Sequence, residues 1–174
     1  MPLYGELDYH NITPSVQPFV NKTYTLIGPM TAIVHYSYVG NTAYMFVKAM
    51  EAIKQNPDVG GEFFFAADDT PPSRFPATIG PFFEQFNVKT SKWHVPFWLI
   101  MSFVFFIYCL FYVIRLFKAV DVVNLGFTTG SISFLNTTCH VTYDKAKTLL
   151  GYKPLYDYKK SVEMSKKFYA TSVL

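Results

Sequence analysis

The adjacent carboxylates of Asp68 and Asp69 are the side chains in this sequence most suggestive of chemistry. Two neighbouring carboxyl groups can divide the roles of general acid and general base between them. This pair, however, follows the short apolar run Glu62–Ala67 and precedes Thr70 and two prolines. Aspartates at such a position commonly accept hydrogen bonds from the backbone of a turn. We therefore favour a turn-forming role for Asp68 and Asp69, with a catalytic pair as the alternative.

The sequence gives no indication of a metal site or of nucleic-acid binding. The four histidines are scattered, at His10, His35, His94 and His140. No group of His, Cys, Asp and Glu has the spacing of metal ligands, and G-x-S-x-G, H-E-x-x-H and Walker phosphate-loop motifs are absent. The net charge is only +3, which gives no electrostatic basis for general nucleic-acid binding. We expect neither a metal nor a nucleic acid as a partner.

The elements that must position Asp68 and Asp69 alternate between helix and strand. A helix is predicted to run from Gly40 to Lys54, with Asn41 as its cap. Its buried face should carry Ala43, Phe46, Val47, Met50 and Ile53, and its solvated face Tyr44, Lys48 and Glu51. Glu62–Ala67 is predicted to be a strand buried on both faces, as in a helix-covered sheet. This rhythm predicts an α/β fold.

Shorter elements are expected before this unit. Prolines and glycines interrupt residues 1–31, so long regular elements cannot form there. One helical turn is expected at Ser15–Val20, and a short strand at Tyr24–Ile27 before the Gly28-Pro29 turn. Thr31–Val39 is β-prone and is expected to be extended.

Three further helices and an irregular stretch are expected after it. The first helix opens near Ser73 or Pro76 and carries Ile79, Phe82, Phe83 and Phe86. The others are Tyr143–Leu150, with Thr142 as N-cap and Gly151 as C-cap, and a final helix from a capping Asp157 to about Tyr169. Val120–Cys139 is expected to be irregular or extended.

Val95–Ile114 is a long apolar stretch without charge or glycine. As a helix rising about 1.5 Å per residue, it would match the ~30 Å hydrocarbon core of a bilayer. Its flanks are aromatic and basic, with Lys92, Trp93 and His94 on one side and Arg115 and Lys118 on the other. Because the stretch has no polar stripe, we predict contact with a membrane. The alternative is an unusually apolar helix buried in the core of a soluble protein.

The two cysteines are predicted to be free thiols. Cys109 lies inside the apolar stretch and Cys139 outside it, so a disulfide between them would have to reach into the membrane. Free thiols suit a reducing compartment that faces the cytosol. The Asn-x-Ser/Thr triplets at Asn11, Asn21 and Asn136 are short enough to arise by chance, and no signal peptide is visible.

Four stretches, read in order, resemble the C-terminal part of the 3β-hydroxysteroid dehydrogenase/isomerase family, which belongs to the extended short-chain dehydrogenases. The first three are Leu3–Glu6, like the family's YGE; Tyr38–Ala43, like YVGN-x-A; and Phe64–Pro71, like an aromatic strand ending in DDTP. The fourth is Tyr143–Lys147 followed by Leu150–Leu155, like KA…LGY-x-PL. The resemblance implies an incomplete C-terminal portion of a Rossmann-type α/β fold, mostly helical with a few short strands, plus one membrane-associated helix.

The resemblance also implies a cofactor that this chain does not bind by itself. Family members use NAD(P), yet the glycine-rich phosphate loop, the acidic ribose-binding residue and the Tyr-x-x-x-Lys group all precede the YGE point. Tyr44 and Lys48 have the right spacing, but they follow YVGN, well downstream of the family's catalytic helix. We interpret them as an exposed i,i+4 pair and expect no catalytic or cofactor-binding residue in this chain. At Asn124–Phe127 the sequence departs from the family's FNR run.

By its place in the family, the chain is expected to contribute a substrate pocket and a membrane anchor to an oxidoreductase acting on the 3β-hydroxyl of a steroid or sterol. The candidate substrate-binding residues are Tyr36, Tyr38, Val39, Asn41 and Asp69. Membrane lipid and a sterol are the expected partners, and the endoplasmic reticulum or mitochondrial membrane is the expected location.

The expected organisation has three parts. Residues 1–92 would form the remnant of the sheet and substrate region, residues 93–118 the membrane helix, and residues 119–174 the C-terminal helices. Two other functions stay open at this point. One is a non-catalytic membrane protein that binds lipid or a partner, and the other is a soluble protein whose apolar helix forms a subunit interface.

Overall fold

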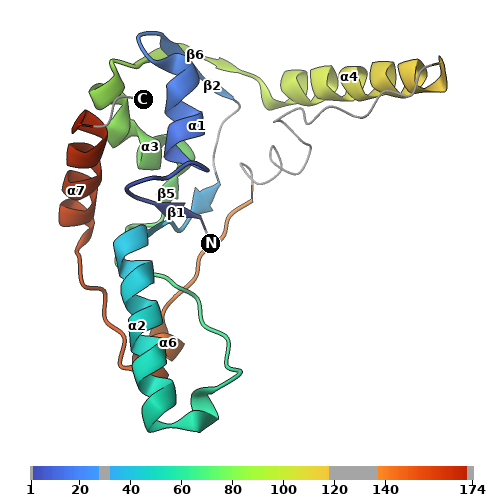
Figure 1. Cartoon of the computed structure of the whole chain (residues 1–174). Coiled ribbons are helices and arrows are strands. Elements are labelled where there is room, and N and C mark those ends of the chain that lie inside the picture. Colours follow the sequence, from blue (N-terminus) through green and yellow to red (C-terminus); the bar gives the residue numbers. More distant parts are fainter. Residues whose placement is uncertain (1, 28–31, 118–136, 172–174) are drawn as a thin grey trace.

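The computed structural model describes residues 2–27, 32–117 and 137–171, with the backbone alone for 115–117 (Figure 1). Helices predominate in this part of the chain. The α-helices are α1 (Ile12–Val16), α2 (Val39–Gln55), α3 (Phe75–Phe83), α4 (Phe97–Phe117), α6 (Asp144–Leu150) and α7 (Tyr158–Thr171). Short 3-10 turns follow α1, α2 and α3, at Gln17–Phe19, Pro57–Val59 and Glu84–Phe86. The predicted mixture of helices with a few short strands and one long apolar helix is confirmed.

The described strands form three two-stranded sheets. The strands are β1 (Leu3–Tyr4), β2 (Thr23–Ile27), β3 (Ile33–Val34), β4 (Ser37–Tyr38), β5 (Ser73–Arg74) and β6 (Lys89–Val95). β1 pairs with β4 and β2 with β6, both in parallel, whereas β3 and β5 are antiparallel. The parallel β1–β4 pair is the one that brings the first two family-like motifs side by side.

A first apolar core lies where α1, α3 and α7 pack against the short strands. Its fully buried members include Tyr4, Ile12, Tyr36 and Phe82. The predicted apolar face of the third helix is confirmed, because Ile79, Phe82, Phe83 and Phe86 all belong to this core. Tyr169 of α7 closes the core with edge-on contacts to Phe82 and Phe86.

A second, smaller core joins α2 to α6. Met45 of α2 packs there with Val59, Ala146, Leu150 and Tyr152. The C-cap prediction for α6 is confirmed, since Gly151 adopts a left-handed conformation with φ of 61°. Asp157 caps α7 as predicted, accepting a hydrogen bond from the backbone N–H of Lys160 at 2.8 Å.

The prediction for the faces of α2 is wrong. Met45 points into the second core, whereas Phe46, Val47, Met50 and Ile53 are exposed. The 3.6-residue pattern identified an apolar face correctly, but no described element covers it. The helix is anchored instead through the neighbouring face, which carries Tyr44 and Ala49 against the second core.

The predicted strand Glu62–Ala67 is absent from the described structure. Those residues form neither strand nor helix, and Phe63 and Phe65 are exposed. A strand needs a hydrogen-bonded neighbour, and no described strand lies beside this stretch. The Thr31–Val39 prediction is met in part, as the two short strands β3 and β4.

Three predicted element starts need correction. Asn41 is not the cap of α2, because the helix begins at Val39 and the Asn41 side chain is buried in other contacts. α6 begins at Asp144 with Tyr143 at its N-cap position, so Thr142 does not cap it. The first short helix begins at Ile12, ahead of the predicted turn.

The apolar helix α4 begins at Phe97, after Pro96, because Lys89–Val95 forms β6. A proline cannot donate to a strand ladder and is well tolerated at a helix start. In Figure 1 α4 extends away from the rest of the described chain. The window Phe97–Ile114 is long and apolar enough to cross a membrane, and only 6% of it is buried. Within the described residues, this exposure contradicts the alternative of a helix enclosed in a soluble core.

The remaining predictions concern the two cysteines, which the structure describes, and several loop residues, which it does not. Cys109 and Cys139 are free thiols, as predicted, and both are exposed. The departure from the family pattern at Asn124–Phe127, the Gly28-Pro29 turn and most of Val120–Cys139 lie outside the described residues.

Candidate functional site

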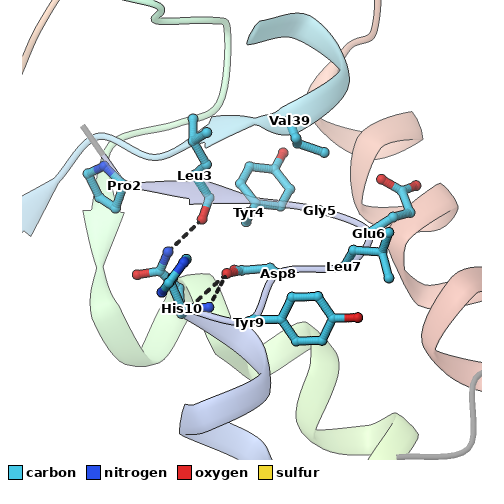
Figure 2. Close-up of a pocket in the computed structure, with 11 residues that line it drawn as sticks. Pro2, Leu3, Tyr4, Gly5, Glu6, Leu7, Asp8, Tyr9, His10 and Val39 are labelled. Atoms are coloured by element: carbon cyan, nitrogen blue, oxygen red, sulfur yellow. Dashed lines mark hydrogen bonds between the residues drawn. The ribbon is translucent and has the colours of Figure 1, made fainter. Parts of the chain in front are cut away.

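A surface pocket of about 340 Å³ lies along the loop after β1 (Figure 2). Residues 2–11 line it, and Val39 from the start of α2 closes one side. Leu7 and Tyr9 expose more than half of their surface at this loop, at 59% and 66%. Leu7 has a positive φ of 58°, a conformation that is uncommon for a leucine and that concentrates at functional sites. The pocket therefore has an apolar, solvent-accessible lip.

Asp8 holds this loop in shape. Its carboxylate accepts hydrogen bonds from the backbone N–H groups of His10, Asn11 and Ile12, at 2.9, 2.8 and 3.0 Å. These N–H groups lie at the start of α1, where donors have no partner within the helix. The loop is thus fixed to α1 by one carboxylate.

Tyr169 of α7 fixes the other side of the loop. Its hydroxyl donates to the carbonyl oxygen of Gly5 at 2.8 Å and accepts from the backbone N–H of Asp8 at 3.2 Å. Both partners border the pocket, so the C-terminal helix takes part in shaping it.

Tyr38 and Glu6 form a polar contact next to the pocket. The Tyr38 hydroxyl lies 3.0 Å from each oxygen of the Glu6 carboxylate and donates to it. Burial and this carboxylate both raise the pKa of Tyr38. The phenol is therefore held in its neutral, donating form, unlike a tyrosine prepared to act as a base.

A buried carboxylate organises the start of α2. Asp68 accepts hydrogen bonds from the backbone N–H of Tyr38 at 2.9 Å, from the amide of Asn41 at 2.8 Å, and from the backbone N–H of Thr70 at 2.9 Å. The positive end of the α2 dipole faces the same carboxylate. The bond to Thr70 confirms the turn-forming interpretation of Asp68.

Asn41 extends this network to the C-terminal motif. Its amide nitrogen donates to the carbonyl oxygen of Tyr156 at 2.8 Å, and its amide oxygen accepts from the N–H groups of Leu155 and Tyr156. Asn41 is 1% exposed, so these contacts satisfy a fully buried amide. Together, Asp68 and Asn41 join three family-like motifs that lie far apart in sequence.

Asp69, in contrast, faces outward. Its carboxylate accepts a hydrogen bond from the hydroxyl of Tyr143 at 2.7 Å. This bond, aided by partial burial, raises the pKa of Tyr143 to about 12. The two adjacent aspartates do not share one site, because Asp68 is buried and Asp69 is exposed.

The five candidate substrate residues lie in different environments. Tyr36, Tyr38 and Asn41 are buried, with exposures of 2%, 2% and 1%. Val39 lines the pocket, and Asp69 lies at the surface. Glu6, Leu7 and Tyr9 were not among the candidates, because nothing in their sequence pattern shows that the loop returns alongside α2.

Among the described residues, the glycines and the helix start that could meet a dinucleotide are engaged in other contacts. The sequence contains no glycine-rich phosphate loop, and two of its motif glycines are engaged in packing. A Cβ at Gly5 would collide with the side chain of Val39, and one at Gly40 with the ring of Tyr38. The anion-binding end of α2 is already occupied by Asp68. Within the described residues, no group of three His, Cys, Asp or Glu side chains could hold a metal ion.

Exposed aromatic and apolar side chains lie beyond the pocket, around the start of α4. Trp93 in β6 and Trp98 in α4 expose 83% and 68% of their surface, and both are close in sequence to the start of the apolar helix. Tryptophan is enriched where a helix meets the lipid headgroups. The geometry thus places an apolar-lipped pocket and an exposed apolar helix in one chain.

Comparison with known proteins identifies a family for this chain. The model of the 3-beta hydroxysteroid dehydrogenase/isomerase family matches residues 1–97. Curated relatives are the sterol-4-alpha-carboxylate 3-dehydrogenases (decarboxylating) of Mus musculus, 25% identical over 138 residues, and of Bos taurus, 26% identical over 130 residues. These alignments cover 79% and 75% of this chain but 37% and 35% of the relatives. The chain spans little more than a third of their length, and it belongs to the 3-beta hydroxysteroid dehydrogenase/isomerase family.

Proposed function

We propose that this chain forms the substrate-binding and membrane-anchoring C-terminal part of an NAD(P)-dependent oxidoreductase that acts on the 3β-hydroxyl of a sterol. The observation that carries the proposal is the extent of the family match. Residues 1–97 contain the whole pocket and end where α4 begins. The relatives' names supply the substrate class, a sterol carrying a 4α-carboxylate.

The pocket suits one end of a sterol. Leu7, Tyr9 and Val39 offer apolar surface, and the neighbouring Glu6 and His10 offer polar groups at the same opening. A rigid apolar ligand with one polar end requires this combination of a largely apolar lining and a few fixed polar groups. Val39 is the candidate residue that lines the pocket, which supports a direct contact with the sterol. Tyr38 supports the pocket from behind through its strand pairing with Tyr4 and its hydrogen bond to Glu6. Asn41 fixes the start of α2 through Asp68 and Tyr156.

The helix α4 would place this pocket near lipid. An exposed apolar helix that follows the pocket-bearing segment would sit in or cross a bilayer, in which sterols are already concentrated. The segments 1–92, 93–118 and 119–174 would then act as substrate region, anchor and C-terminal support. The membrane of the endoplasmic reticulum or the mitochondrion is the proposed location.

The chain alone is proposed to be inactive, because its sequence has neither a glycine-rich loop nor a Tyr-x-x-x-Lys group in the family's context. NAD(P) chemistry would be supplied by the part of the family fold that the chain does not span. The test places the full 174-residue chain in lipid nanodiscs with NAD or NADP and a 3β-hydroxysterol, with and without a 4α-carboxylate. We expect no reduced cofactor and saturable sterol binding. Cofactor reduction, or an absence of sterol binding, would contradict the proposal.

A non-catalytic lipid-binding protein is the second candidate, favoured by the exposed α4 alone. The variants Leu7→Asp and Val39→Asp distinguish the two functions. Loss of sterol binding with unchanged membrane association supports the substrate pocket. Sterol binding that survives both substitutions but is lost when α4 is disrupted supports the lipid-binding protein. Release of the chain from membranes by alkaline carbonate would instead favour a soluble protein with an apolar subunit interface.

A further inference from the structure

Strand β6 carries two lysines and a tryptophan whose exposure the proposed function does not explain. Lys89, Lys92 and Trp93 are all exposed, and Trp93 exposes 83% of its surface. This is the largest exposed fraction among the large hydrophobic side chains of the described residues. Pro96 alone separates the end of β6 from α4 (Figure 1). The three side chains are therefore close in sequence to the start of the exposed apolar helix.

A bulge in β6 accounts for the outward position of the tryptophan. The register between β2 and β6 shifts after Tyr24, so that β6 has two more residues than β2 before pairing resumes at His94. The extra length falls at residues 91–93, where the backbone N–H of Trp93 donates to the hydroxyl of Ser91 at 3.0 Å. Bulges redirect side chains away from the regular ladder. The fold therefore holds this tryptophan in solvent through a defined local structure.

The ribbon formed by β2 and β6 is basic. Lys22 precedes β2, and its carbonyl oxygen accepts the backbone N–H of Lys89 at 3.0 Å, so two lysines lie together at one end of the ribbon. The sequence has no Asp or Glu at residues 9–50 or 85–120, which contain both strands. Neither these two lysines nor Lys92 forms an ion pair with a described residue. Their positive charge is therefore not neutralised within the described part of the chain.

Protection of a sheet edge does not explain this combination of side chains. Edge strands often carry lysine, because its charge discourages pairing with other chains. An exposed Trp93 works against that purpose, since it adds apolar surface to the same edge. At a membrane surface, in contrast, tryptophan lies at the level of the headgroups and lysine extends its ammonium group toward their phosphates. The combination therefore favours a lipid surface.

The apolar helix does not by itself select a class of lipid. α4 would contact acyl chains, and these are alike in neutral and anionic phospholipids. A choice of headgroup must come from groups outside the hydrocarbon core. Each lysine close to an anionic leaflet favours binding by about fivefold, over a range of about 10 Å at 0.1 M salt. The lysines of the ribbon are the described groups that could supply this choice.

We propose that the β2–β6 ribbon is a docking surface for the headgroups of anionic phospholipids. Lys22, Lys89 and Lys92 would contact the negatively charged headgroups, and Trp93 would lie among them where α4 enters the bilayer. The proposal rests on the proposed anchoring role of α4. It adds a preference for one lipid class, which anchoring by an apolar helix does not require.

The test uses the two tryptophans of the chain, Trp93 and Trp98. Trp98→Phe leaves Trp93 as the single reporter in the full 174-residue chain. This chain is placed in phosphatidylcholine nanodiscs that contain the same small fraction of either brominated phosphatidylserine or brominated phosphatidylcholine. Bromine on an acyl chain quenches tryptophan fluorescence at close range, so quenching reports which lipid gathers at the ribbon. We expect brominated phosphatidylserine to quench Trp93 at least about threefold more than brominated phosphatidylcholine.

Charge variants locate the preference. Lys89→Gln combined with Lys92→Gln should bring the quenching by the two lipids close together. Unchanged quenching by brominated phosphatidylcholine would show that the ribbon of this double variant keeps its place. Lys159→Gln, at an exposed position near the start of α7, should leave the preference intact. A preference that survives the double variant, or that Lys159→Gln removes equally, would overturn the assignment to the ribbon.

Failure of this proposal is distinguishable from failure of the anchoring role. Equal quenching of Trp93 by the two lipids overturns the anionic docking surface and leaves the anchor in place. A chain that stays in the nanodiscs while neither lipid quenches Trp93 also overturns it, and this is the result expected if the ribbon binds an acidic protein instead. A chain that does not remain with the nanodiscs overturns the anchoring role as well. Sterol binding is measured separately and enters none of these outcomes.

Discussion

The two sides of α2 contrast sharply. At its N-terminal end, Asp68 and Asn41 satisfy each other and the surrounding backbone through contacts within the chain. Along its outer face, Phe46, Met50 and Ile53 have no covering element among the described residues. The polar groups of Asp68 and Asn41 at one end of the helix therefore have partners, whereas the apolar side chains along one side have no packing partner among the described residues. The polar contacts at the N-terminal end fix the position of the helix. The exposed apolar side chains along its outer face are suited to packing against another apolar surface.

Removal of the Asp68 carboxylate should destabilise α2 more than any of the other substitutions. Asp68→Ala leaves three donors buried without an acceptor, and each such loss costs about 1–3 kcal/mol. We expect α2 to lose about 3–5 kcal/mol of stability, measured by amide exchange of its backbone. Asp69→Ala is the control, because among the described residues its exposed carboxylate accepts a hydrogen bond from Tyr143 alone. Similar losses in both variants would refute the central role of Asp68.

The next prediction compares the same substitution at two methionines of α2, of which one is buried and the other is exposed. Met45→Ala empties a space in the second core and should cost about 2–3 kcal/mol. Met50→Ala, at a position that is 58% exposed, should change stability by less than about 0.5 kcal/mol in the chain alone. The same denaturant titration serves both variants. A Met50→Ala effect as large as that of Met45→Ala would show that the outer face is already covered.

Gly5→Ala tests the close approach of the pocket loop to α2. The new Cβ would collide with Val39, and Gly5 has a φ of 146°, so we expect a loss of about 2 kcal/mol. Val39→Ala in the same chain should restore part of this loss, by relieving the collision but not the backbone strain. A double variant no more stable than Gly5→Ala would indicate that strain alone is responsible.

The smallest effect concerns Tyr143. Its pKa is raised to about 12 chiefly by the hydrogen bond to Asp69, so Asp69→Asn should move it back toward 10. The raised value means that this contact stabilises the fold fully below pH 10 and is lost as the pH rises through about 12. Difference absorbance titration against Tyr143→Phe isolates this tyrosine. An unchanged pKa in Asp69→Asn would mean that burial, rather than the carboxylate, sets it.

Sequence patterns correctly predicted the features of the fold that depend on residues close together in the sequence. The apolar face of α3, the C-cap at Gly151 and the cap at Asp157 depend on neighbours within a few residues, and the structure confirms them. The membrane-length helix was predictable because its composition alone distinguishes it. Asp68 was correctly assigned to a turn for the same local reason.

The long-range contacts could not be predicted. Asn41 looked like a helix cap, but its amide is engaged by Leu155 and Tyr156, more than a hundred residues later in the sequence. The apolar pattern of α2 and the Glu62–Ala67 run both indicated burial, and neither is fully buried in the described chain. Periodicity reports that a face is suited to burial, but it does not say which polypeptide provides the cover.

The hydroxyl of Tyr169 has a consequence for the order in which the protein is made. It holds Gly5 and Asp8, so the pocket loop near the N-terminus is secured by a residue near the C-terminus. During synthesis, α4 leaves the ribosome well before α7. The proposed membrane anchor is therefore available to lipid while the pocket still lacks its last support. Ribosome stalling before residue 158 should yield a chain that is already membrane-bound but has an open, protease-sensitive loop at residues 5–11.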